Sequence, residues 1–150
     1  MILYHINAGF SLLSENTLLK LDSLETIPED DESHRDLARW ARFQPPTRGF
    51  LEQNFVHQPR PGPDGWAEVQ VLNPDLRLGL RLRYHTSTLP YLNEWKMMGE
   101  GLYVLAVEPM NCNHLPGRAA MRAQKTLPEL QPGESRNYRI ELELLELEPA

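Results

Sequence analysis

Apolar and polar side chains alternate over residues 76–84, LRLGLRLRY, in the middle of the chain. Successive side chains of a β-strand point to opposite faces, so the leucines and Tyr84 would face a core and the arginines solvent. Residues 137–148, NYRIELELLELE, repeat the alternation near the C-terminus. Alternation with a period of two residues predicts antiparallel strands that are buried on one face.

Further strands are predicted where short apolar runs lie between turn signals. These runs cover residues 2–6, 18–27, 50–57, 66–72 and 101–110. Residues 29–43 carry the spacing of one short helix, with Asp30, Asp31 or Ser33 as candidate N-cap. Residues 91–101, YLNEWKMMGEG, hold two glycines and are predicted to form a loop. We therefore expect a single all-β domain over residues 1–150, an antiparallel sandwich or partial barrel of five to eight strands.

Composition excludes several classes of protein. Lysine and arginine number 15 against 21 acidic residues, and the net charge of −6 argues against a nucleic-acid or anionic-membrane surface. Cys112 is the single cysteine, so no intrachain disulfide forms. The sequence shows no signal peptide and no apolar run long enough to span a bilayer, so we expect a cytoplasmic protein. The five histidines lack metal-binding spacing, and no motif predicts a metal or a cofactor.

Two titratable residues stand out against this background. His5 and Asn7 lie two apart in YHINAGF, residues 4–10, and so share one strand face. Glu108 ends the apolar run 103–107, where poor solvation would raise the pKa of its carboxyl group towards that of a useful base. The alternatives are a structural histidine and a strand-end glutamate that reaches solvent, and base rates favour both alternatives.

Trp95, Lys96 and a row of arginines each allow two interpretations. The indole of Trp95 suits stacking on a sugar ring or plain packing, and Lys96 is a ligand donor or a solvated charge. Arg77, Arg81 and Arg83 share one face of the strand at 76–84, where they would bind anions or pair with a neighbouring row of glutamates. Pairing with Glu141 and Glu143 is the favoured interpretation, because both rows alternate with apolar residues.

Taken in order, several segments resemble one family. They are YHINAGF at 4–10, EQNFVH at 52–57, residues 72–111 including LPYLNEWKMMGEGLYVLAVEP, the pair Gly117-Arg118, and LQPGESRNYRIELE at 130–143. Together they resemble the C-terminal half of an aldose 1-epimerase-like (galactose mutarotase-like) protein, of the uncharacterised DUF4432 branch. The resemblance covers most of the chain and implies a β-supersandwich whose concave face binds a small-molecule sugar.

The resemblance also implies a mechanism without a cofactor. A histidine donates a proton to the ring oxygen of the sugar while a glutamate takes one from the anomeric hydroxyl, so that the ring opens and closes on either face. By position, His5 matches the acid and Glu108 the base. Asn7, Trp95, Lys96 and Arg118 would bind the substrate.

The family domain is about twice as long as this chain, so the resemblance implies an incomplete sandwich with exposed edges. Exposed edges and apolar faces predict association with a second copy or with a missing N-terminal half. Two functions stay open. One is an isomerase that interconverts sugar anomers, and the other is a non-catalytic carbohydrate-binding or structural remnant of the fold.

Overall fold

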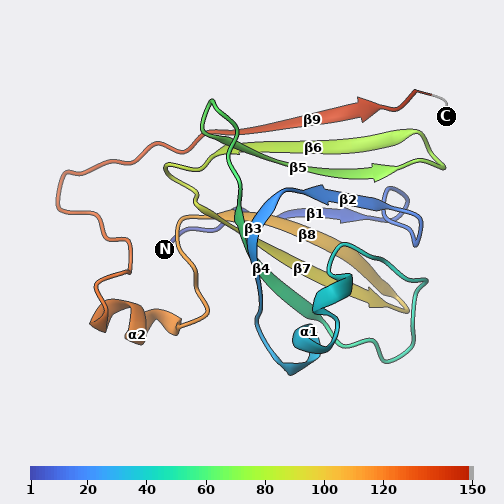
Figure 1. Ribbon diagram of the computed structural model, residues 1–150, viewed down its shortest axis with the longest axis horizontal. Coiled ribbons are helices and arrows are strands. Elements are labelled where there is room, and N and C mark those ends of the chain that lie inside the picture. The colour runs from blue at the N-terminus through green and yellow to red at the C-terminus, as the bar shows by residue number, and fades with distance from the viewer. Residues whose placement is uncertain (149–150) are drawn as a thin grey trace.

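The computed structural model describes residues 1–148, which form two antiparallel sheets (Figure 1). Sheet A has the strand order β1 (Ile6–Gly9), β8 (Leu102–Met110), β7 (Tyr91–Gly99), β4 (Gln53–Pro59) and β3 (Ser23–Pro28). Sheet B has the order β2 (Leu18–Leu21), β5 (Trp66–Asn73), β6 (Leu78–His85) and β9 (Ile140–Glu146). The predicted all-β antiparallel sandwich is therefore confirmed, but residues 1–148 form nine strands where five to eight were expected.

The core lies between the two sheets. Of the row predicted to face it, Leu80, Leu82 and Tyr84 are buried as predicted, whereas Leu76 and Leu78 are exposed. Leu82 and Tyr84 are almost fully buried and share one apolar cluster with Leu105 and Val107 of β8. Because neighbours in a strand face opposite ways, Leu105 and Val107 identify the face of sheet A that is turned towards sheet B. The other face of sheet A is turned away from sheet B.

On the outer face of sheet B, the arginines of β6 pair with the glutamates of β9 in register. Arg81 lies opposite Glu143 and forms an ion pair with it, and Arg83 lies opposite Glu141 at 3.0 Å. The favoured interpretation of these rows is confirmed. Arg77 does not belong to the row, because it lies in the turn before β6 with a positive φ of 54°.

The stretch predicted as one strand over residues 18–27 is two strands in different sheets. β2 pairs with β5 in sheet B, and β3 pairs with β4 in sheet A. The chain passes between the sheets at Asp22, whose carbonyl oxygen accepts a hydrogen bond from Arg60 N at 2.8 Å. A loose apolar alternation does not show where a strand changes sheets, so the prediction missed this break.

The stretch predicted as a loop over residues 91–101 is wrong in its main part, because β7 occupies it. This strand lies between β4 and β8 and pairs with β8 from Tyr91 to Gly99. The glycines that suggested a loop serve the tight turn after it, where Gly101 adopts a positive φ of 81°. The segment therefore presents its side chains alternately to the two faces of sheet A.

The predicted helix is a short one, α1 (Asp31–Arg35), followed by a 3-10 turn, η1 (Leu37–Arg39). Asp30 is its N-cap, and its carboxylate accepts a hydrogen bond from Ser33 N at 2.8 Å. This hydrogen bond lowers the pKa of Asp30. A second short helix, α2 (Gly117–Ala123), was not predicted. No helix within residues 1–148 is long and apolar enough to cross a membrane.

Apolar side chains remain exposed at the edge of sheet B. Leu142 and Leu144 of β9 lie opposite the buried Leu82 and Leu80, yet they are 58% and 83% exposed.

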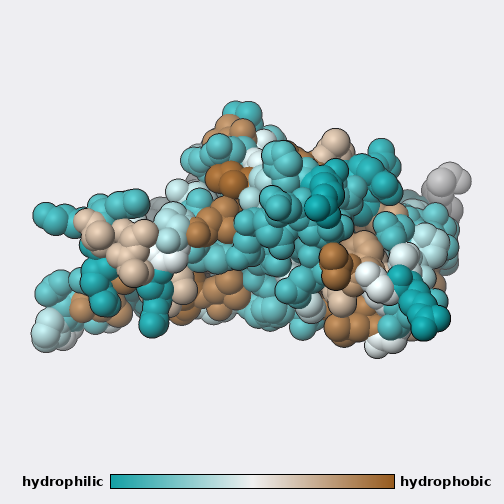
Figure 2. Space-filling view, turned by 90° about the horizontal axis from the view of Figure 1, so that it is seen from below, coloured by the Kyte–Doolittle hydropathy of each residue, from teal (hydrophilic) through white to brown (hydrophobic). Residues whose placement is uncertain are grey.

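Figure 2, seen from below, shows separate apolar patches among hydrophilic side chains. It also shows a lobe on the left, where Figure 1 places α2 and the segment after it. The predicted exposure of apolar surface is thus present.

Candidate active site

Two neighbouring rows of side chains cross sheet A on the face turned away from sheet B. Directly paired residues of antiparallel strands point to the same face, so the backbone register defines each row. The first row holds Glu108, Asn93, Val56 and Ile27, and the second holds Asn7, Ala106, Trp95 and Asn54. His5 extends the first row, because Tyr4 N donates to Pro109 O at 3.0 Å and continues the pairing of β1 with β8. The backbone therefore sets His5 beside Glu108.

His5 and Glu108 are in direct contact at one end of the first row. His5 Nδ1 lies 2.8 Å from Glu108 Oε1, and such a contact requires a proton on one of the two atoms. The imidazole is 48% exposed, whereas the carboxylate is only 4% exposed. The pair thus combines a buried carboxylate with a histidine that reaches solvent.

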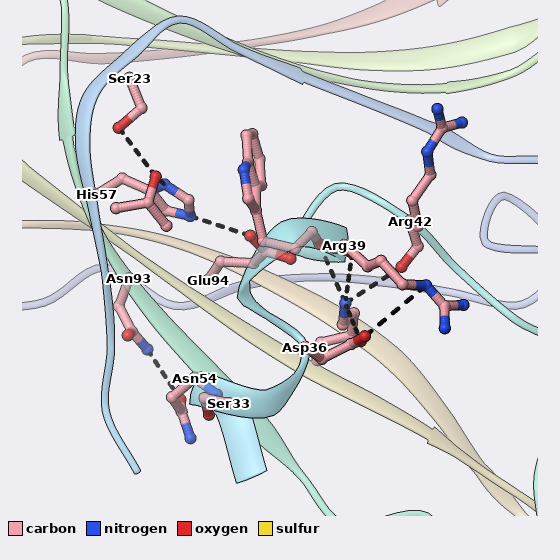
Figure 3. Close-up of polar contacts among 12 residues, drawn as sticks. Ser23, Ser33, Asp36, Arg39, Arg42, Asn54, His57, Asn93 and Glu94 are labelled. Carbon is pink, nitrogen blue, oxygen red and sulfur yellow. Dashed lines mark hydrogen bonds and ion pairs between the residues drawn. The ribbon is translucent and has the colours of Figure 1, made fainter. Parts of the chain in front are cut away.

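Asn93 holds the second oxygen of this carboxylate. Its Nδ2 donates to Glu108 Oε2 at 2.9 Å. The same Nδ2 lies 3.3 Å from Asn54 Oδ1 in the next strand, as Figure 3 shows. Asn93 itself is 4% exposed. The carboxylate therefore presents Oε1 to His5 while Oε2 stays fixed to the sheet.

Burial raises the pKa of the Glu108 carboxyl group above its ordinary value. Glu29 raises this pKa further, while the hydrogen bond from Asn93 and the charges of His5 and His114 lower it. The net direction is upward, because desolvation of the charged form dominates. A carboxyl group with a raised pKa is a better general base than an ordinary surface glutamate.

Trp95 and Asn7 lie in the second row, next to this pair. The Trp95 ring centroid is 6.2 Å from that of His5, and its Nε1 donates to Glu52 Oε2 at 2.9 Å. The indole is therefore held by its edge while its ring stays half-buried. Between Trp95 and Asn7 stands the small side chain of Ala106.

Lys96 lies on the opposite face of sheet A from Trp95. Its Nζ is buried and contacts the carbonyl oxygens of Arg39, Trp40 and Arg42 at 3.1–3.4 Å (Figure 3). Burial lowers its pKa. Lys96 therefore fastens the segment after η1 to β7 and does not join the candidate site.

The same interior face carries a second pair of titratable residues, His57 and Glu94. His57 Nε2 lies 3.0 Å from Glu94 Oε2, and both side chains are completely buried. Thr26 Oγ1 lies 3.0 Å from His57 Nδ1, and Trp40 packs on the ring edge to face. Without solvent access, this pair links β4 and β7 and has no route to a substrate.

Arg118 lies in the first turn of α2 with an exposed side chain, and it forms no hydrogen bond or ion pair within residues 1–148. Of the six residues expected at the site, the structure brings together His5, Glu108, Asn7 and Trp95. Within the same described range, no group of His, Cys, Asp and Glu is arranged to hold a metal ion.

Sequence reasoning missed Asn93 and Asn54, which complete the polar network around Glu108. Asn93 is two residues before Trp95, so a strand at 91–99 would have put both on one face. The position of Asn54 next to Asn93 depends on the pairing of that strand with β4, and no local sequence pattern shows this pairing.

The fold and the site define an antiparallel sandwich of galactose mutarotase-like type with a contacting histidine and glutamate on one sheet face. A crystal structure described as a "putative aldose 1-epimerase" from Klebsiella pneumoniae subsp. pneumoniae is similar, with a TM-score of 0.87 and 28% identity. The similarity covers 96% of this chain but 38% of that one, so this chain spans well under half of its relative.

The chain belongs to the family described as a domain of unknown function, DUF4432, which it matches over residues 1–144. This membership agrees with the resemblance found in the sequence. A comparison with curated proteins finds no match.

Proposed function

We propose that the chain interconverts the anomers of a sugar, as an aldose 1-epimerase-like isomerase that uses His5 and Glu108. The observation that carries the proposal is the 2.8 Å contact between an exposed imidazole and a buried carboxylate on the face of sheet A that is turned away from sheet B. Opening a sugar ring needs an acid and a base of different proton affinity, and this pair provides both. The similarity to a solved structure described as a putative aldose 1-epimerase supports the same proposal.

In the proposed reaction, Glu108 takes the proton of the anomeric hydroxyl. The electrons of that O–H bond form the C1 carbonyl, the bond from C1 to the ring oxygen breaks, and the ring oxygen takes a proton from His5. Rotation about the C1–C2 bond turns the other face of the aldehyde towards the ring oxygen. The reverse transfers then close the ring as the other anomer and restore both residues.

The contact between the two residues has to open before this reaction can start. The anomeric hydroxyl replaces His5 Nδ1 at Glu108 Oε1, while Asn93 keeps hold of Oε2. His5 is able to turn away because half of its side chain is exposed. Trp95 would stack on the apolar face of the sugar ring, and Asn7 would bind a hydroxyl group.

The second candidate function is sugar binding without catalysis. The closed contact between His5 and Glu108 favours it, since a carboxylate that keeps its histidine partner does not reach the anomeric hydroxyl. The substitution Glu108→Gln separates the two functions. Binding without turnover in the unaltered protein, and unchanged binding in this variant, would support the second candidate.

The test follows freshly dissolved α-anomers of several aldopentoses and aldohexoses by polarimetry, with and without protein. The proposal predicts that at least one of them reaches its anomeric equilibrium faster with protein than in buffer. Equal rates over the whole panel, with a protein shown to be folded, would refute it.

A further inference from the structure

Glu29 and His114 form a second pair of titratable side chains beside the proposed acid–base pair. Glu29 directly follows β3, and its backbone N donates to Asn54 O at 3.0 Å, so Glu29 extends the row that contains Trp95. His114 lies between β8 and α2. The two segments are far apart in the sequence, yet His114 Nε2 lies 3.7 Å from Glu29 Oε1.

The separation of the two side chains suits a hydroxyl group that bridges them. A separation of 3.7 Å is longer than a hydrogen bond, so neither side chain satisfies the other. An oxygen atom about 2.8 Å from both atoms accepts a hydrogen bond from Nε2 and donates one to Oε1. The side chains are 26% and 38% exposed, so both are accessible from solvent.

One further observation marks His114 itself, and another connects the pair to the candidate site. His114 Nδ1 is buried and has no hydrogen-bond partner within residues 1–148, which is unusual for a ring nitrogen. The charges of both His114 and Glu29 shift the pKa of Glu108, so they lie within electrostatic reach of the proposed base. The pair is thus part of the same face and is not an isolated surface contact.

The charges around it limit the class of ligand. Glu29, Glu52 and Glu108 bring three carboxylates to this face. In the described part of the chain, no lysine or arginine forms a hydrogen bond or ion pair with these three side chains, and Lys96 points to the other face. Carboxylates accept hydrogen bonds from hydroxyl groups and repel phosphate and carboxylate groups.

We propose that Glu29 and His114 bind a hydroxyl group of the substrate remote from its anomeric carbon, and that the substrate is an uncharged sugar. This inference rests on the proposed function of His5 and Glu108, because it takes the anomeric carbon to lie at that pair. It assigns the pair a binding role and no proton transfer.

The experiment measures binding and turnover of D-glucose and D-galactose by the unaltered protein, Glu29→Gln and His114→Gln. Each variant should lose one hydrogen bond between the protein and a sugar hydroxyl group. We therefore expect its Kd to rise roughly tenfold or more, with little change in kcat. Glu25→Gln is the matched control, since Glu25 is an exposed glutamate of β3, the strand that Glu29 directly follows. Unchanged Kd values in both site variants would overturn the inference.

Two additional readouts distinguish its failure from that of the proposed function. Histidine side-chain nitrogen NMR should show the His114 resonances shifting with sugar, and glucose 6-phosphate should bind roughly tenfold more weakly than glucose. Tighter binding of the phosphate would overturn the uncharged class. Turnover that survives with unchanged Kd in the variants refutes this inference alone. If the unaltered protein binds sugar but does not turn it over, and the two variants bind it more weakly, only the proposed function is refuted.

Discussion

Trp95 and Lys96 are consecutive residues of β7, yet they face opposite sides of sheet A. Trp95 lies in the row that contains Asn54 and Asn7, whereas the ammonium group of Lys96 is buried against backbone carbonyl groups on the interior face. One strand thus supplies both a wall of the candidate site and an anchor for the segment after η1. The two side chains should therefore respond to substitution in different ways.

Replacing Trp95 by leucine should weaken sugar binding and leave the fold intact. Losing the stacked ring costs about 1 kcal/mol of binding free energy, which is a Kd roughly fivefold higher. Isothermal titration with the sugar that turns over fastest measures this change. Trp66→Leu, in sheet B, is the control and should leave Kd unchanged. A Kd that does not differ between the two variants would place the sugar elsewhere.

Replacing Lys96 by methionine should lower the free energy of unfolding by about 3 kcal/mol. The substitution leaves carbonyl oxygens of the segment after η1 without their buried donor. Urea unfolding followed by tryptophan fluorescence measures the loss. Lys20→Met alters an exposed lysine of β2 and should change stability by less than about 0.5 kcal/mol. Equal stability of both variants would show that the Lys96 contacts contribute nothing.

Replacing Asn93 by leucine should shift the pH dependence of turnover upward. The loss of kcat/KM at acid pH reports protonation of Glu108. Because the pKa of Glu108 is raised above the ordinary value of 4.5, this loss should occur at a pH above 4.5. Because the Asn93 hydrogen bond lowers this pKa, removing it raises the pKa, and activity is lost at a higher pH than in the unaltered protein. Asn16→Leu, in the turn before β2, is the control. A loss that stays at the same pH would separate Asn93 from the base.

Replacing Arg83 by methionine should cost only about 0.5–1 kcal/mol of stability. Arg83 contacts Glu141 and Asp64 at 3.0 Å each and lies 5.1 Å from the Trp66 ring, but it is partly exposed. Because salt screens exposed ion pairs, the difference from the unaltered protein should shrink in urea titrations at high salt. A loss that grows with salt would contradict this explanation.

The strands with regular alternation were predictable because local pattern and tertiary burial agree there. Leu82 and Tyr84 alternate with Arg81 and Arg83, and each set faces the side that its polarity indicates. The same agreement made the pairing with Glu143 predictable. The short strands around Asp22 gave no such signal, because the change of sheet depends on contacts with distant segments.

The candidate site was predictable only in part. His5 and Glu108 stood out as polar residues in apolar strands, and the family resemblance assigned their roles. The segment around Trp95 and Lys96 was misinterpreted as a loop because of its two glycines. Its buried polar residues also interrupt the apolar pattern that would have indicated a strand. His114 could not be foreseen, since it lies in an irregular segment that folds back towards β3.

The most direct test of the central claim is exchange NMR on an equilibrated aldose with the unaltered protein, His5→Ala, Glu108→Gln and the double variant. If the two residues act as one acid–base unit, the unaltered protein exchanges α- and β-anomers faster than buffer. Each single variant then loses at least roughly a hundredfold in rate, and the double variant is no worse. Single variants that retain the rate of the unaltered protein would contradict the claim that this pair opens the sugar ring.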